Sequence, residues 1–161
     1  MEDTLYLLAL KYLNYRQRSE KEIKDYLQKK LTKRHSELDS ESQNIIFLVI
    51  ARLKKQKFLN DEEFAKMWIR SRKSFRPKGE RLIRLELKQK GITKEIIDSV
   101  FENNEDQKSD LELAKELLEK KRKKFEPLGR QERFNKAGAF LARRGFDLDV
   151  IKKVIDQIFE K

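Results

Sequence analysis

The sequence predicts an all-α protein of three tandem three-helix repeats that form an elongated array, straight or curved. Glycine and proline are scarce, at five and two among 161 residues, and this scarcity favours long helices over a turn-rich β protein. Hydrophobic residues make up 38% and charged residues 42% of the chain. That balance suits a thin array with much surface per unit of core. Apolar residues recur at helical spacings of three and four.

The first repeat is predicted over residues 1–57. Its first helix begins near Asp3, which we expect to act as the N-cap. Ser19 followed by Glu22 is a capping box and predicts the start of the second helix. A polar stretch at about 32–42 is predicted to be an insert loop before the third helix.

The second repeat is predicted over residues 58–106. Asn60, with a glutamate three positions later, marks the start of its first helix. A proline and Gly79 interrupt the chain before the second helix. That helix is predicted to end at Gly91 in a left-handed cap, and Thr93 is predicted to cap the third helix.

The third repeat is predicted over residues 107–161. Ser109, with a glutamate three positions later, marks a further capping box. A break at Gly129 precedes a helix that is predicted to end at Gly145, and Asp147 is predicted to cap the last helix. Together the three repeats contain roughly nine helices of ordinary length.

An internal motif, F-x-P-x-G, supports the repeat assignment. It occurs at 75–79 and again at 125–129, each time after the first helix of a repeat. The distance from Gly129 to the next helix-ending glycine is longer than the distance from Gly79 by about one helical turn. We therefore expect a longer middle helix in the third repeat.

Three aromatic residues near this motif have two possible roles. Phe75 and Phe125 lie beside basic runs and could stack on nucleic-acid bases. A phenylalanine next to a proline in a turn is more often a plug for the core, and that is the role we predict for both. Trp68 lies on an apolar helical face and is also predicted to be core.

The positive charge is concentrated in two blocks. The net charge is +11, and residues 66–91 contain ten basic and two acidic residues. Residues 120–153 contain twelve basic and four acidic residues, whereas 102–119 is mostly acidic. Charge grouped in this way favours a polyanionic partner or one with an acidic groove. The alternative is that these basic faces are merely solvated.

We expect the partner- or DNA-binding surface to be formed by the basic residues of these blocks. This assignment depends on charge alone, although Arg81, Arg84 and Lys88 also share one helical face. The candidate binding residues are Arg70, Arg72, Lys73, Arg76, Lys78, Arg81, Arg84, Lys88, Lys120, Lys121, Arg122, Lys123, Lys124, Arg143 and Arg144.

The sequence carries no pattern of catalytic or metal chemistry. It has no cysteine, and its single histidine, His35, lies in a polar stretch without partners for a metal site or a catalytic dyad. It also has no glycine-rich phosphate loop. The acidic run 61–63 is explained by the positive end of a helix dipole. We therefore predict a protein that is not an enzyme, without catalytic residues, metal or cofactor.

Neither a membrane span nor a signal peptide is evident. The longest apolar run, 45–51, is far too short to cross a bilayer. The acidic start at Glu2 and Asp3 does not resemble a secretory signal. We expect a soluble cytoplasmic protein.

Four motifs in series resemble one family. They are FLNDEEFA with WIRSR at 58–72, the P-K-G…E-L…K-G-I pattern at 77–92, RQRSEKEI at 16–23 and FLARRGF at 140–146. Taken in their order along the chain, they resemble the RecX family of bacterial recombinase regulators. One departure is Leu31, which stands where the family has a glycine after the first repeat's second helix.

The resemblance implies a function that composition does not. RecX-like proteins are modular three-helix-repeat proteins that bind within the groove of the RecA–DNA filament. They modulate, and usually inhibit, strand exchange and coprotease activity, which places them in homologous recombination, DNA repair and the SOS response. The resemblance implies a monomer whose partners are the RecA filament and single- or double-stranded DNA, with no membrane. Two alternatives stay open, namely a stand-alone basic DNA- or RNA-binding protein and an adaptor for a protein partner alone.

Overall fold

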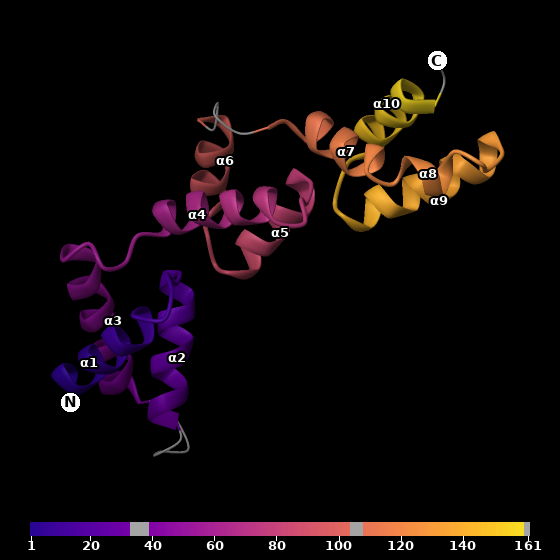
Figure 1. The fold of residues 1–161 in the computed structure, drawn as a ribbon. Coiled ribbons are helices and arrows are strands. Elements are labelled where there is room, and N and C mark those ends of the chain that lie inside the picture. The colour runs from indigo at the N-terminus through magenta and orange to yellow at the C-terminus, as the bar shows by residue number, and fades with distance from the viewer. Residues whose placement is uncertain (33–38, 104–107, 160–161) are drawn as a thin grey trace. The chain divides into compact units, whose positions relative to one another are not determined.

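The computed structural model describes residues 1–32, 39–103 and 108–159, and every regular element in these ranges is an α-helix (Figure 1). The prediction of an all-α fold is confirmed. The described ranges contain ten helices, one more than the roughly nine expected, because the four-residue α8 was not anticipated. The predicted insert at 32–42 lies mostly outside the described residues; Thr32 closes α2, and Ser40 already begins α3.

The helices follow the predicted order along the chain. They are α1 (Glu2–Leu13), α2 (Glu20–Thr32), α3 (Ser40–Lys55), α4 (Asp61–Ser74), α5 (Glu80–Gln89), α6 (Lys94–Glu102), α7 (Asp110–Glu119), α8 (Arg122–Phe125), α9 (Arg130–Arg143) and α10 (Leu148–Phe159). The middle helix of the third repeat, α9, has 14 residues and its counterpart α5 has 10. The expected longer middle helix is therefore confirmed.

The chain divides into two compact units that do not coincide with single repeats. The first unit comprises Met1–Lys66 with Leu87–Val100, and the second comprises Met67–Glu86 with Phe101–Lys161. The helices of the second repeat thus contribute to both units.

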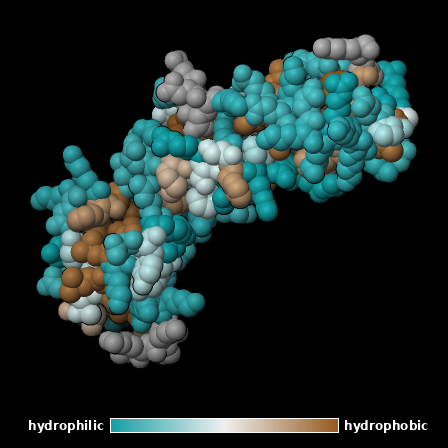
Figure 2. All heavy atoms as spheres, viewed as in Figure 1, coloured by the Kyte–Doolittle hydropathy of each residue, from teal (hydrophilic) through white to brown (hydrophobic). Residues whose placement is uncertain are grey.

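Each unit has an apolar core of its own. The core of the first unit is formed by α1, α2 and α3, and that of the second by α7, α9 and α10 with Phe125 from α8. Leu53, Phe146 and Leu118 are among the largest fully buried side chains. Figure 2 shows apolar residues on the visible face of α1–α3, and the exposed large apolar side chains of these helices are Leu7, Phe47 and Leu48.

The helix starts predicted from capping patterns are largely confirmed. Ser19 and Ser109 form reciprocal capping boxes with the glutamates three residues later. The Asn60 side chain accepts hydrogen bonds from two backbone N–H groups of α4, at 2.9 and 3.1 Å. Thr93 caps α6 at 3.4 Å. The Asp3 cap is wrong, because α1 begins at Glu2 and the Asp3 carboxylate accepts a hydrogen bond from an arginine of α3.

The two glycines predicted to end helices are in the left-handed region. Gly91 has φ of 80° and Gly145 has φ of 86°. A Cβ at Gly91 would stand 2.6 Å from the Cβ of Lys21, and a Cβ at Gly145 would stand 2.3 Å from the Cβ of Leu82. Both positions therefore need glycine for backbone conformation and for close packing.

Two of the three aromatic predictions are wrong. Phe125 is buried in the core of the second unit, as predicted. Phe75, at the same place of the same motif, is 78% exposed. Trp68 is only half-buried, because its indole N–H points at the Glu86 carboxylate, 2.9 Å away. An indole N–H that is partly removed from water usually has such a hydrogen-bond partner.

A first repeat joint, formed by Ser19–Glu22, Asp61 and Lys90–Gly91, lies within the first unit. The Ser19 hydroxyl donates to the Lys90 carbonyl oxygen at 2.7 Å. The backbone N–H of Glu20, at the start of α2, donates to the Asp61 carboxylate at 2.8 Å. The first residue of α4 thus caps α2, a helix of the preceding repeat. The start of one repeat therefore supplies the hydrogen-bond acceptor that an N–H group at the helix end of another repeat needs.

A second repeat joint, formed by Gly79–Leu82, Asp110 and Arg144–Gly145, repeats this arrangement within the second unit. The backbone N–H of Gly79 donates to the Arg144 carbonyl oxygen at 2.8 Å. The N–H of Glu80, at the start of α5, donates to the Asp110 carboxylate at 2.8 Å. Burial raises the pKa of both capping carboxyls, Asp61 and Asp110, above the usual value.

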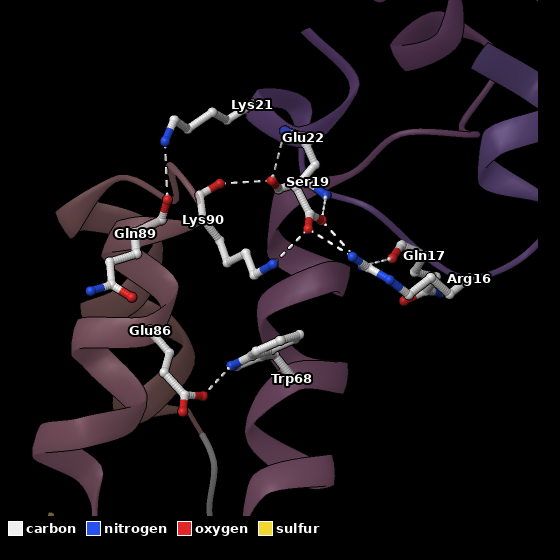
Figure 3. A network of polar contacts seen from close by, with 9 residues as sticks. All are labelled: Arg16, Gln17, Ser19, Lys21, Glu22, Trp68, Glu86, Gln89 and Lys90. Atoms are coloured by element: carbon white, nitrogen blue, oxygen red, sulfur yellow. Dashed lines mark hydrogen bonds and ion pairs between the residues drawn. The ribbon is translucent and has the colours of Figure 1, made fainter. Parts of the chain in front are cut away.

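The carboxylate of Glu22 gathers three donors at the first repeat joint, as Figure 3 shows. It accepts from the guanidinium of Arg16 at 2.8 Å, from the ammonium of Lys90 at 2.6 Å and from the backbone N–H of Ser19 at 3.2 Å. Burial alone would raise the pKa of Glu22. The hydrogen bonds from Arg16, Lys90 and Ser19 outweigh it and lower this pKa to about 2.

A pH-dependent contribution to stability follows from the pKa of Glu22. Because the folded pKa lies below the ordinary value of 4.5, the ionised carboxylate stabilises the fold above that pH, and the contribution is lost as pH falls towards 2. Glu22→Gln should lower the free energy of unfolding by about 2 kcal/mol at neutral pH, and the difference should shrink between pH 4.5 and 2. Urea unfolding at a series of pH values measures it. A difference that stays constant across this range would contradict the assignment.

Candidate basic groove

A cleft of about 820 Å³ lies within the second unit, and we refer to it as the basic groove. One wall comes from the last turns of α4 and the turn that follows it, and the other from α7 and the residues at its two ends. Five of the candidate binding residues line it. The lining residues are Arg70, Lys73, Ser74, Phe75, Arg76, Pro77, Lys108, Leu113, Glu116, Leu117, Lys120 and Arg144.

The groove combines positive charge with apolar surface. Leu113, Leu117 and Pro77 contribute apolar surface to its walls. Its single acid, Glu116, is already paired with Lys108. Among the described residues, no carboxylate lies within ion-pairing distance of Arg70 or Lys120. The positive charge of the groove is therefore available to an anion.

The residue after Phe75 has a backbone conformation that differs from its counterpart in the third repeat. Arg76 has φ of 54°, in the left-handed region. The chain is held after this turn by the N–H of Lys78, which donates to the Arg72 carbonyl oxygen at 3.1 Å. In the matching turn of the third repeat, Glu126 is in the right-handed helical region, and Phe125 packs inward against Phe140 at a centroid distance of 6.3 Å.

Three more candidate binding residues line a second, smaller hollow in the same unit. Lys121, Lys124 and Arg143 surround a volume of about 320 Å³ beside the rings of Phe125 and Phe140. The ammonium of Lys121 lies 5.5 Å from the ring centroid of Phe140. This hollow lies next to basic residues that also contact aromatic faces, so part of their charge is used within the protein.

Five candidate binding residues form ion pairs within the chain. Arg84 pairs with Glu80 at 2.6 Å, and Arg81 lies 3.6 Å from the Asp147 carboxylate. Arg122 lies 3.3 Å from the Glu126 carboxylate. Arg72 and Lys78 both pair with Glu86. The last two candidates, Lys88 and Lys123, are exposed.

Glu86 holds the groove's α4 wall against α5. Its carboxylate accepts from the Arg72 guanidinium at 2.7 Å, from the Trp68 indole at 2.9 Å and from the Lys78 ammonium. Burial alone would raise the pKa of Glu86, but the hydrogen bonds from Lys78, Arg72 and Trp68 outweigh it and lower the pKa. The guanidinium of Arg72 also stacks on the Trp68 ring, 4.2 Å from its centroid. Arg72 and Lys78 therefore support the α4 wall of the groove through their ion pairs with Glu86.

Sequence reasoning missed one cation of the groove. Lys108 precedes Ser109, the N-cap of α7, and its carbonyl oxygen accepts a hydrogen bond from the Lys73 ammonium at 3.1 Å. It was overlooked because it lies in the mostly acidic stretch between the two basic blocks. Ser109 was predicted to start a helix, and that helix, α7, forms one wall of the groove. The position of Lys108 just before Ser109 was therefore the signal that could have identified it.

The described residues show neither a cluster of metal ligands nor a membrane-spanning helix. They contain no group of three or more His, Cys, Asp and Glu side chains that could hold a metal ion. No helix within them is both long and apolar enough to cross a membrane.

Three family models match consecutive parts of the chain. They describe the first, second and third three-helix domains of RecX, and they match residues 6–32, 60–100 and 108–155. Together they account for more than half of the chain.

Curated relatives agree with these matches. The chain is 40% identical to the regulatory protein RecX of Oceanobacillus iheyensis and 37% identical to that of Bacillus subtilis. The matches cover 98% and 93% of this chain but 55% and 53% of the relatives. The chain thus spans about half the length of the curated relatives it matches.

Solved structures give the same result. The crystal structure of RecX from Lactobacillus salivarius matches with a TM-score of 0.78 at 25% identity, covering 98% of this chain and 96% of that one. A second crystal structure, of a regulatory protein RecX, matches with a TM-score of 0.73 at 25% identity, covering 96% of this chain and 71% of the other. The three-helix repeats expected from the sequence are confirmed, and the chain belongs to the RecX family.

Proposed function

We propose that this chain regulates the RecA recombinase by binding the RecA–DNA filament and inhibiting its recombinase and coprotease activities. It acts by contact and not by catalysis, in the cytoplasm and as a monomer. Membership of a family whose curated relatives are named regulatory proteins supports the regulatory role. The observation that carries the proposal is the basic groove, where cations from separate elements converge and the single lining carboxylate, Glu116, pairs with Lys108 alone.

A filament of recombinase on DNA suits such a groove. DNA carries one negative charge per phosphate, and a cation that replaces a condensed counterion gains binding free energy from the ion's release. A regulator that binds an assembled filament can also act at a low ratio to its subunits, because one bound molecule affects its neighbours. We therefore expect substoichiometric action.

The test is RecA-driven ATP hydrolysis and strand exchange on single-stranded DNA, with the chain added at substoichiometric amounts. We expect both activities to fall. Unchanged hydrolysis and unchanged exchange, at concentrations where the chain is folded by circular dichroism, would overturn the proposal.

A second candidate function is stand-alone binding of DNA or RNA. The exposed ring of Phe75 within the groove favours it, because an aromatic face serves a base better than it serves an acidic protein surface. It predicts salt-dependent binding to bare nucleic acid with no effect on RecA.

A further inference from the structure

We propose that the basic groove binds single-stranded nucleic acid directly, with a base stacked on the exposed ring of Phe75 and phosphates held by Arg70, Lys73 and Lys120. This inference deepens the proposed function and rests on it for the identity of the polyanion. It specifies a single strand as the ligand and names the side chains that recognise it.

The first support is the difference between two copies of one motif. The F-x-P-x-G turn buries Phe125 to 3% exposure, but it leaves Phe75 at 78%. A large apolar ring in water gains nothing for the fold. The same motif can bury its ring, so the exposure of Phe75 is a property of this copy.

The second support is the backbone that holds the ring outward. Arg76, which has a Cβ, adopts φ of 54°, a left-handed conformation that costs such a residue about 1–2 kcal/mol. The ammonium of Lys78, paired with Glu86, fixes the chain just beyond it. Strain of this kind persists where the surrounding structure enforces it and is concentrated at binding sites.

The third support is the chemistry around the ring. Phe75 lines the same cleft as Arg70, Lys73 and Lys120, and the apolar side chains of Leu113 and Leu117 line it too. Single strands are bound by grooves in which cations follow the backbone while bases stack on aromatic side chains. The guanidinium of Arg76, 5.8 Å from the ring centroid, adds a cation beside the stacking face.

A single strand fits these features better than a duplex. In a duplex the bases are stacked on each other, and their faces are closed to a side chain. An unpaired base can turn out onto an aromatic ring while its phosphates remain on neighbouring cations. Phe75 therefore makes the groove selective for unpaired nucleotides, whereas the cations alone would bind either form.

Fluorescence anisotropy of a labelled oligothymidylate of about 15 nucleotides, with the full chain and no recombinase, tests the proposal. Loss of one stacked base should weaken binding about 5- to 140-fold in Phe75→Ala. Phe75→Trp should keep most of the affinity, because the indole ring retains an aromatic face on which a base can stack. Binding to a duplex of the same length should change by less than about threefold in Phe75→Ala, since duplex phosphates meet only the cations.

The chain offers a matched control in Phe58→Ala. Phe58 is 55% exposed and follows Lys57, which has φ of 60°, so it shares the exposure and the left-handed neighbour of Phe75. It lines a different hollow, with Glu63, in the first unit. Its substitution should leave oligothymidylate binding unchanged. Equal loss in both variants, no loss in Phe75→Ala, or equal loss for the duplex would overturn the proposal.

Two further measurements identify the type of strand and distinguish failure of this inference from failure of the proposed function. An oligouridylate of equal length shows whether the strand is DNA or RNA, and tight binding of either one supports the proposal. RecA-driven hydrolysis that is inhibited by a chain without affinity for free single strands would overturn this inference and leave the proposed function in place. Phe75-dependent binding of single strands with no effect on RecA would support this inference and overturn the regulation of RecA.

Discussion

Gly79→Ala should destabilise the second unit by about 3 kcal/mol or more. A Cβ at Gly79 would stand 2.3 Å from the carbonyl oxygen of Gly145 and 2.6 Å from the backbone nitrogen of Phe146. Backbone atoms cannot move aside as the end of a flexible side chain can. The clash would also stretch the Gly79 N–H hydrogen bond to Arg144, now 2.8 Å. Urea unfolding followed by Trp68 fluorescence measures the loss, because Trp68 lies in the same compact unit.

Gly129→Ala is the matched control, since Gly129 holds the same position in the second copy of the motif. Among the described residues other than its two chain neighbours, no atom lies within 4 Å of the place where its Cβ would stand. Each glycine directly precedes the middle helix of its repeat, so both variants lose the same preference for glycine at a helix start. We expect Gly129→Ala to cost less than about 1 kcal/mol. If both variants lost the same free energy of unfolding, the clash at the second repeat joint would not be the cause of the destabilisation by Gly79→Ala.

Local signals along the chain predicted most of the helix ends. Ser19, Ser109 and Asn60 could be identified because a cap uses side chains within three residues of the helix start. Gly91 and Gly145 could be identified because left-handed helix ends favour glycine. These interactions are made within a few residues, and so they leave a pattern in the sequence.

The joints between repeats left no such pattern. Asp61 looked like one of three acids at a helix start, yet its carboxylate caps α2, whose first residue, Glu20, is 41 positions earlier. Asp110 caps α5 in the same way, 30 positions from Glu80. Only the packing of one repeat on another brings these groups together. The repetition of the same bond in both joints shows why a short carboxylate follows Asn60 and Ser109.

The candidate binding residues show the same limit. Charge alone could not separate Arg72, which Glu86 neutralises from 14 positions away, from Lys73, which lines the groove. The motif could not separate Phe75 from Phe125, because the difference lies in the backbone of the following residue and in what packs against each ring. The basic binding surface predicted from the sequence, and its exact members, therefore remain a proposal.

Reversing three groove cations should raise the amount of this chain needed to suppress RecA-driven ATP hydrolysis on the order of 100-fold or more. The variant is Arg70→Glu, Lys73→Glu and Lys120→Glu together. Each position would turn an attraction for phosphate into repulsion at short range. The slope of log affinity against log salt for single-stranded DNA should also become shallower by about two, because about 0.7 of a counterion is released per phosphate contact on single strands.

The control for that variant changes the net charge equally but outside the groove. Lys29→Glu, Lys55→Glu and Lys94→Glu lie in the first unit, and all three side chains are exposed. At physiological salt, exposed charges are screened beyond about 8 Å, so these reversals should weaken suppression far less than those in the groove. If both triple variants were equally impaired, the partner would respond to the chain's net charge of +11 and not to the convergence of cations around Phe75. A difference between them would place recognition in the groove, because the two variants have the same net charge and differ in where the reversed charges lie.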